Sequence, residues 1–366
     1  MTQPDNRSLP GVTFRPWRVP LLALLAVLLR VSLPPSLVEA IYSRGLFVLL
    51  RTGWDHTLAR LPVPLFYVFW LLVLFLAGRA LYRWRQKRRQ GQGGSWRGAG
   101  LGLLQIVSLL VLVFLLGWGF NYGRETVEER MGFTVYQPTL DELRARVYAE
   151  ADTLARLRLA VTADTSAIGA AAFSPDLEQE VREMLRLALL RHDYPAPGRP
   201  RARQLYPRGL LLHLSTAGVY WPWAGEGNID AGLHPLQKPP VMAHELAHAY
   251  GFGDEGTCTF WAWLAGAEST DPLLAYAFRL DYWRRLAGRL RQAEPEAYWA
   301  WREANLLPGI QNDLQSIYDN AAQYQDIAPV LRDVTYDAYL KVQGVQEGML
   351  SYGRVVRMVE GYRRKE

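Results

Sequence analysis

Three stretches of apolar sequence occupy the first third of the 366-residue chain. Residues 62–82 and 98–120 are each long enough to cross a hydrocarbon core of about 30 Å as a helix, and 62–78 and 98–120 carry no charge. Residues 17–33 form a shorter stretch with Arg30 near one end, where a long side chain can reach the interface. We therefore predict three N-terminal transmembrane helices, with residues 1–120 as a membrane anchor and 36–50 as an amphipathic helix beside it.

Beyond residue 120 the pattern changes to amphipathic helices with marked starts. Thr139 followed by Glu142 forms a capping box, and Ser174 before Pro175 predicts another helix start. Further helices are expected over 273–292, 295–305, 311–323 and 348–363, and short strands over 209–215 and 228–231. The prediction for 121–366 is an α+β domain of mostly helices with a small sheet.

An aromatic segment, GVYWPWAGEGNIDAG, begins at Gly218. It resembles the edge strand of a zincin cleft, where main-chain pairing could hold an extended peptide. In an equally supported alternative, Trp221 and Trp223 only pack the domain or lie near the membrane interface.

The net charge of +6 and the pI near 9.4 are unevenly distributed. Residues 1–119 hold fourteen Lys and Arg against three Asp and Glu, which leaves an acidic excess in the remainder. The segment 83–97 lies between two apolar stretches and is strongly basic, which predicts a cytoplasmic loop. This places 121–366 outside the cytoplasm, predicts a lipid bilayer as partner and argues against a nucleic-acid partner.

The motif HELAH stands at 244–248, within PPVMAHELAHAYGFGDEG. On a helix, His244 and His248 lie on one face and can bind one zinc ion, while Glu245 can take a proton from a water. Composition alone gives such a match in roughly one chain in two hundred. The single cysteine, Cys258, excludes a Cys-rich zinc module and is expected to be a small buried residue.

The third zinc ligand has two candidates after the turn that Gly251 and Gly253 allow. Asp254 would complete HExxHxxGxxD. Alternatively Asp254 caps the next helix and Glu255, in the first turn of that helix, reaches back to the metal, which we favour. His213 and His234 are further candidates, although lone histidines more often make ordinary polar contacts.

Several motifs together resemble an uncharacterised family of bacterial membrane-anchored proteins, classed as a domain of unknown function, with three N-terminal spans and a HExxH domain. The matching segments are LVEAIYSRGLF, NYGRE, GVYWPWAGEGNID, HELAHAYGFGDEGTCTFWAWLA and YLKVQGVQEGMLSYGRVV. The resemblance implies a zinc metallopeptidase of the bacterial inner membrane. Many members carry Arg-Glu-Asp-Glu-Ala-Asn after the Gly turn; the first glutamate maps to Glu255 and the second to Thr257, where this chain has no carboxylate.

The sequence therefore predicts a membrane-anchored, zincin-like metallopeptidase that hydrolyses a peptide or protein substrate. Zn²⁺ would be held by His244, His248 and Glu255, with Glu245 as general base. Tyr352, in the SYGR segment, is a candidate donor to the oxyanion. The alternative is a non-catalytic, zinc-stabilised envelope or scaffolding protein. No oligomeric state is indicated.

Overall fold

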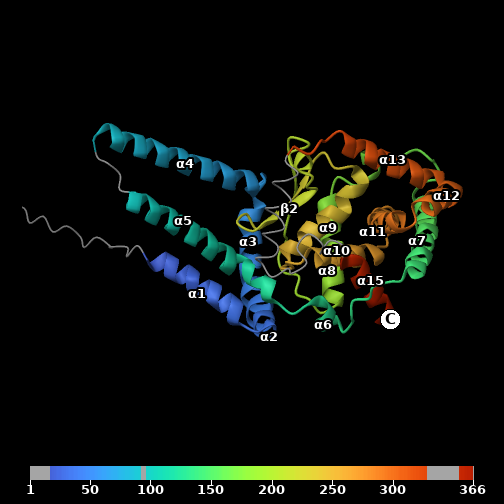
Figure 1. Ribbon diagram of the computed structural model, residues 1–366, viewed down its shortest axis with the longest axis horizontal. Coiled ribbons are helices and arrows are strands. Elements are labelled where there is room, and N and C mark those ends of the chain that lie inside the picture. Colours follow the sequence, from blue (N-terminus) through green and yellow to red (C-terminus); the bar gives the residue numbers. More distant parts are fainter. Residues whose placement is uncertain (1–16, 92–95, 328–353, 366) are drawn as a thin grey trace, which may run out of the picture.

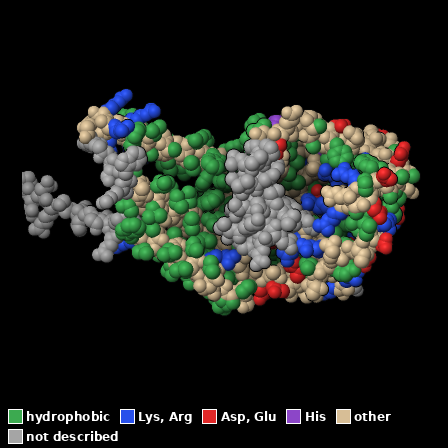
Figure 2. Space-filling view, viewed as in Figure 1, with side chains coloured by type: hydrophobic (Ala, Val, Ile, Leu, Met, Phe, Trp, Pro, Cys, Tyr) green, Lys and Arg blue, Asp and Glu red, His purple; other side chains and the backbone are tan. Residues whose placement is uncertain are grey.

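The apolar helices form an elongated bundle at one end of the molecule (Figure 1). The computed structural model describes residues 17–91, 96–327 and 354–365. α1 (Arg18–Ser32) packs along α5 (Trp96–Gly117), and α4 (Leu65–Arg89) extends in the same general direction. Hydrophobic side chains cover these helices in Figure 2. Within the described ranges, α4 and α5 are long and apolar enough to cross a membrane, and α1 with the bent segment 35–60 makes a third candidate. The apolar helices are thus confirmed, and they indicate membrane association.

The basic residues from 83 to 89 are helical, so this part of the segment between the two apolar stretches continues α4. α4 continues through Arg83, Arg85 and the run 87–89, because Arg, Lys and Gln favour helices. The helix stops at Gln90, next to Gly91 with its φ of +71°. These cations gather at the end of α4 that is remote from the C-terminal part (Figure 2).

The chain between α1 and α4 packs against the base of the bundle. It forms α2 (Pro35–Leu37), the π-helix η1 (Val38–Leu46), α3 (Phe47–His56) and η2 (Leu58–Arg60). Buried Val38, Tyr42 and Phe47 share a hydrophobic cluster with Trp118, which directly follows α5. Residues 36–50 are therefore helical, as predicted, and the apolar side of this segment packs on the neighbouring helices.

The C-terminal part is helix-rich with one small mixed sheet, as predicted. In the sheet order β1-β3-β2, β3 (Glu226–Asp230) pairs parallel with β1 (Ala202–Leu205) and antiparallel with β2 (Gly218–Trp221). The helices are η3 (Gly119–Gly123), α6 (Val127–Met131), α7 (Leu140–Val161), η4 (Ala170–Ala172), α8 (Leu177–Arg191), η5 (Leu212–Leu214), η6 (Pro235–Gln237), α9 (Lys238–Ala249), α10 (Glu255–Ala267), α11 (Pro272–Ala293), α12 (Pro295–Asn305), α13 (Pro308–Ala322) and α15 (Arg354–Lys365).

The capping box at Thr139 is confirmed, but the other predicted helix start is wrong by two residues. Thr139 and Glu142 exchange both bonds of the box at the start of α7. α8 begins only at Leu177, with Asp176 in the N-cap position. Ser174 Oγ instead accepts a bond from the Asp176 amide at 3.1 Å, so it closes a local turn before the helix.

The predicted strand at 209–215 is also wrong, because Asp230 gathers this segment around its carboxylate. Asp230 accepts backbone bonds from Gly209 at 2.8 Å and Leu211 at 2.7 Å. Gly209 has a φ of +90°, which breaks an extended run. A turn and the 3-10 helix η5 result. The strand expected at 228–231 is confirmed as part of β3, whereas β1 was not predicted.

α9 lies at the centre of the C-terminal part. It packs on β3 and β2 on one side and on α8, α10 and α11 on others. Large buried side chains, among them Trp261 and Trp283, fill the surrounding core. A helix enclosed in this way holds its side chains in fixed positions, which matters for the motif that α9 carries.

Candidate metal centre

The HELAH motif lies on α9, and the chain reverses directly after it. Pro239 and Pro240 occupy the first turn, as expected for a helix start. α9 ends at Ala249, and Gly251 adopts a φ of +93°, which favours glycine. α10 then begins at Glu255, so the predicted helix, turn and second helix are all present.

Three side-chain atoms converge between α9 and α10. Glu255 Oε2 lies 2.9 Å from His244 Nε2 and 3.6 Å from His248 Nε2. Ligands of one tetrahedral zinc, with bonds of about 2.0–2.2 Å, lie about 3.3 Å apart. The two distances from Glu255 Oε2 are therefore close to the spacing of ligands on one zinc ion, and all three side chains are at most 14% exposed.

Asp254 has a different function in the structure. Its Oδ1 accepts bonds from the Thr257 amide at 2.7 Å and the Thr257 hydroxyl at 3.0 Å, which makes it the N-cap of α10. Its Oδ2 lies 3.5 Å from an Arg354 guanidinium nitrogen. Of the two candidates, Glu255 is thus the one whose carboxylate contacts the histidines.

Backbone and hydroxyl groups hold the two imidazoles from behind. Thr259 donates its hydroxyl hydrogen to the Glu255 carbonyl at 2.9 Å, so its oxygen accepts from His244 Nδ1 at 3.1 Å. His248 Nδ1 donates to the Phe252 carbonyl at 2.8 Å. Both Nε2 atoms therefore face Glu255, while both Nδ1 atoms are occupied by these supports. Sequence reasoning missed these supports, although Thr259 lies at helical spacing from Glu255.

Glu245 is buried beside the cluster with an unsatisfied oxygen. It is 4% exposed, and its Oε2 has no hydrogen-bond partner among the described residues. Burial raises the pKa of this carboxyl to about 8. A Cβ added to Gly218 would lie 2.6 Å from Glu245 Oε1, and one added to Gly227 would lie 2.6 Å from Glu245 Cβ. The sheet thus leaves room for this side chain only because two glycines face it.

The pKa values of the other three groups shift in different directions. Burial alone would lower the pKa of His248, but contacts with Cys258 and Glu255 raise it well above the usual value, which favours the protonated imidazole while no metal is bound. Burial lowers the pKa of His244, which favours the neutral imidazole. Burial alone would raise the pKa of Glu255, but the two histidines hold it well below its usual value. Glu255 is consequently ionised, as a carboxylate ligand must be.

Cys258 is buried, as predicted, yet it lies close to the histidines. His244, His248 and Cys258 offer ligand atoms within 4.8 Å of one another. The Cys258 sulfur contacts His248 Nδ1 at 3.3 Å, whereas Glu255 contacts Nε2 on the opposite edge of the ring. Burial raises the pKa of the Cys258 thiol to about 12, so the thiol stays protonated near the Phe252 carbonyl, 3.4 Å away.

The other candidate residues lie elsewhere. His213 contacts the Gln325 carbonyl at 2.9 Å, and His234 contacts the Ser316 hydroxyl at 2.9 Å, so both make the ordinary polar contacts expected of lone histidines. Tyr352 lies outside the described residues.

Residues in η1 and directly after α5 support the turn that follows the HELAH helix. Trp118 Nε1 donates to the His248 carbonyl at 2.7 Å. Arg124 donates to the Gly251 carbonyl at 3.2 Å and is held in turn by Glu39, at 2.8 Å. The cluster is therefore braced by the segment after α5 and by η1.

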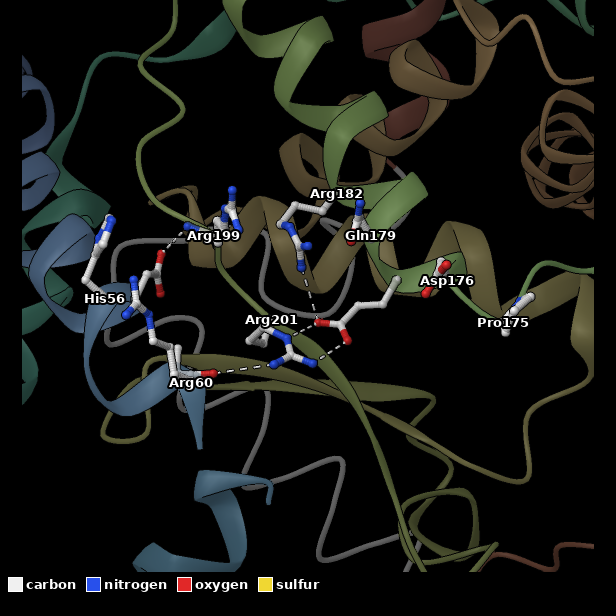
Figure 3. A pocket seen from close by; sticks show the side chains of 11 residues that line it. His56, Arg60, Pro175, Asp176, Gln179, Arg182, Arg199 and Arg201 are labelled. Atoms are coloured by element: carbon white, nitrogen blue, oxygen red, sulfur yellow. Dashed lines mark hydrogen bonds and ion pairs between the residues drawn. The ribbon is translucent and has the colours of Figure 1, made fainter. Parts of the chain in front are cut away.

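A separate cavity of about 620 Å³ lies against α8 and α3, bordered by several arginines (Figure 3). Arg201 and Arg182 both point to the Glu178 carboxylate, with Arg201 at 2.8 Å. Asp55 pairs with Arg51 and accepts from the Arg199 amide at 2.8 Å. The carboxylates of this wall are thus paired with its own arginines, and none of the predicted site residues lines it.

Comparison with known proteins gives one family. A family model described as a protein of unknown function (DUF3810) matches residues 42–359, which is most of the chain. No curated protein and no solved structure matches it.

Proposed function

Since the chain belongs to the DUF3810 family of proteins of unknown function, we propose from its site that it is a membrane-anchored zinc metallopeptidase. The observation that carries this proposal is the convergence of His244 Nε2, His248 Nε2 and Glu255 Oε2 beside Glu245, whose buried oxygen has no described partner. Three protein ligands and one open position are typical of catalytic zinc sites.

The residues of the site have separate tasks in hydrolysis. Zinc, when bound, would polarise the scissile carbonyl and lower the pKa of a water to about 7. Glu245 Oε2 accepts a proton from the attacking water while the oxygen of that water forms a bond to the carbonyl carbon. The same carboxyl then donates this proton to the amine nitrogen as the C–N bond breaks. Thr259 and the Phe252 carbonyl keep both imidazoles oriented throughout.

The proposed location follows from the positions of charge and helix ends. The basic end of α4 and the C-terminal part lie at opposite ends of the apolar helices (Figures 1 and 2). If these helices cross a bacterial inner membrane with the cations in the cytoplasm, the metal centre faces outward. Residues 121–366 would then form an extracytoplasmic domain of zincin-like type.

The test compares the wild type with Glu245→Gln, both full length and reconstituted in vesicles. Zinc content is measured by metal analysis, and hydrolysis is measured with a fluorogenic peptide library. We expect about one zinc per chain in both proteins and a loss of hydrolysis of roughly 10²–10⁴-fold in the variant. Undiminished hydrolysis in the variant, or wild type without zinc, would contradict the proposal.

The proximity of Cys258 favours one second candidate, a non-catalytic zinc-stabilised envelope or scaffolding protein. A fourth protein ligand would close the site, and the Cys258 sulfur offers a ligand atom within 4.8 Å of both histidines. Cobalt substitution distinguishes the two. A thiolate-to-cobalt charge-transfer band that is lost in Cys258→Ala indicates the closed site. An unchanged spectrum in Cys258→Ala with retained hydrolysis indicates the enzyme.

A further inference from the structure

The candidate metal centre is in contact with the end of an apolar helix. Trp118 follows α5 directly, and its indole nitrogen donates to the carbonyl of His248. The Trp118 ring also lies 5.1 Å from the ring of Tyr220 on β2. The C-terminal end of the helix that carries the histidines therefore contacts the end of a candidate membrane span.

The turn between β2 and β3 extends back along the apolar helices. Trp223 Nε1 donates to the Leu110 carbonyl of α5 at 3.1 Å. Leu110 lies seven residues before the helix end at Gly117, which is about 10 Å along the axis at 1.5 Å per residue. Trp221 packs on Phe66 of α4, with ring centroids 5.5 Å apart. The tip of this hairpin thus lies between α4 and α5, about 10 Å from the end of α5 toward the middle of that helix.

The other end of β2 lies at the candidate general base. Gly218 faces Glu245 so closely that a Cβ there would lie 2.6 Å from Oε1. From Gly218 to Trp221 the strand advances by three residues, or about 10 Å. One short strand therefore connects the candidate general base with the apolar helices α4 and α5.

The outer edge of β2 is suited to pairing with an added strand. The Asp230 amide donates to the Ala217 carbonyl at 2.9 Å, so hydrogen-bonded pairs with β3 recur at Val219 and Trp221. The backbone N–H and C=O groups of Gly218 and Tyr220 consequently point away from β3. In the part of the chain that is described, no strand pairs with that edge.

We infer that the substrate is a polypeptide tethered in the same membrane, which pairs with β2 and is cleaved within a few residues of the bilayer surface. This inference rests on the proposed peptidase function. An extended chain along β2 has one end at Glu245 and the other at the tryptophans of the hairpin tip. A tethered chain meets this strand at a high effective concentration, whereas a free chain has to approach the bilayer first.

The experiment uses the full-length protein with zinc in vesicles of phosphatidylethanolamine and phosphatidylglycerol. One probe is a single-span peptide with a randomised extension of about twenty residues, incorporated in both orientations. The second probe is the same extension without the span, and mass spectrometry locates the cuts. Because a strand covers about 3.3 Å per residue, we expect most cuts within about six residues of the span. We also expect the tethered probe to be cut at least about tenfold faster.

The possible results test the tethered-substrate inference and the peptidase proposal separately. Cuts spread evenly along the extension, or equally fast cutting of the free probe, would overturn the tethered-substrate inference. The peptidase proposal would remain intact in that case, provided that Glu245→Gln abolishes the cutting. Absence of zinc-dependent cutting of both probes would overturn both.

A variant at the hairpin tip tests the tethered-substrate inference independently of the two probes. Trp223→Ala is expected to shift the cuts away from the span and to slow cutting of the tethered probe several-fold, with zinc content unchanged. The matched control is Trp299→Ala, because Trp299 is exposed on α12, remote from the site. Identical cut profiles and rates for the two zinc-loaded variants would overturn the inference.

Discussion

The structure makes opposite predictions for two neighbouring carboxylates, Glu255 and Asp254. Glu255→Gln keeps the shape of the side chain but removes the charge that contacts both imidazoles, at 2.9 and 3.6 Å. Loss of a group that only orients a ligand costs about 10–100-fold in metal affinity, so loss of a ligand should cost at least about 100-fold. That is about 2.8 kcal/mol, at 1.4 kcal/mol for each factor of ten. Asp254→Ala removes the N-cap of α10 and the contact with Arg354 but no contact with the histidines, so it should lower the free energy of unfolding by about 1 kcal/mol, with zinc affinity unchanged.

Two measurements distinguish these effects. Zinc affinity is obtained by competition with a chromophoric chelator, and the free energy of unfolding is obtained by urea titration of the metal-free proteins. The wild type and both variants are compared in the same detergent. A 100-fold weaker affinity in Asp254→Ala, together with near-normal affinity in Glu255→Gln, would refute the assignment of Glu255 and support the alternative ligand.

Three further changes test other parts of the site and fold. Thr259→Val removes the acceptor of His244 Nδ1 and should weaken zinc binding about 10–100-fold in the same competition assay. Gly227→Ala would place a methyl group 2.6 Å from Glu245 Cβ, so peptide hydrolysis should fall more than about tenfold while metal analysis shows near-normal zinc content. For Glu178, burial alone would raise the pKa, but its arginine partners hold it below the usual 4.5. The stability from this pair is therefore present above about pH 4.5 and is lost as the pH falls through the lower, folded pKa. Glu178→Gln should cost about 1 kcal/mol at pH 7, and urea titrations from pH 7 to 3 should show the difference disappearing.

Features set by neighbouring residues were predictable from the sequence. The apolar helices follow from unbroken runs of hydrophobic residues, and the turn after α9 follows from Gly251. The N-cap at Asp254 and the reach of Glu255 toward the histidines depend on residues of one short stretch, 244–257. In each case the determining contacts are made within a few turns of one or two helices.

Features set by distant residues were not predictable in this way. The segment 209–215 has the composition of a strand, but the carboxylate of Asp230 draws its amides into a turn. The bond from Trp118 to the His248 carbonyl joins residues 130 positions apart. Hydrophobic periodicity predicts one helix or strand at a time. It therefore cannot predict either of these contacts, because both join residues of different elements.

The contacts of Trp118 and Arg124 with the Gly turn have a consequence for biogenesis. Both residues come directly after α5, and Arg124 is held by Glu39 from the segment after α1. These contacts form only when the apolar helices have packed against one another. If the helices span a membrane, the turn after α9 would be fixed only after their insertion. The candidate metal centre would then be assembled late in synthesis, at the bilayer.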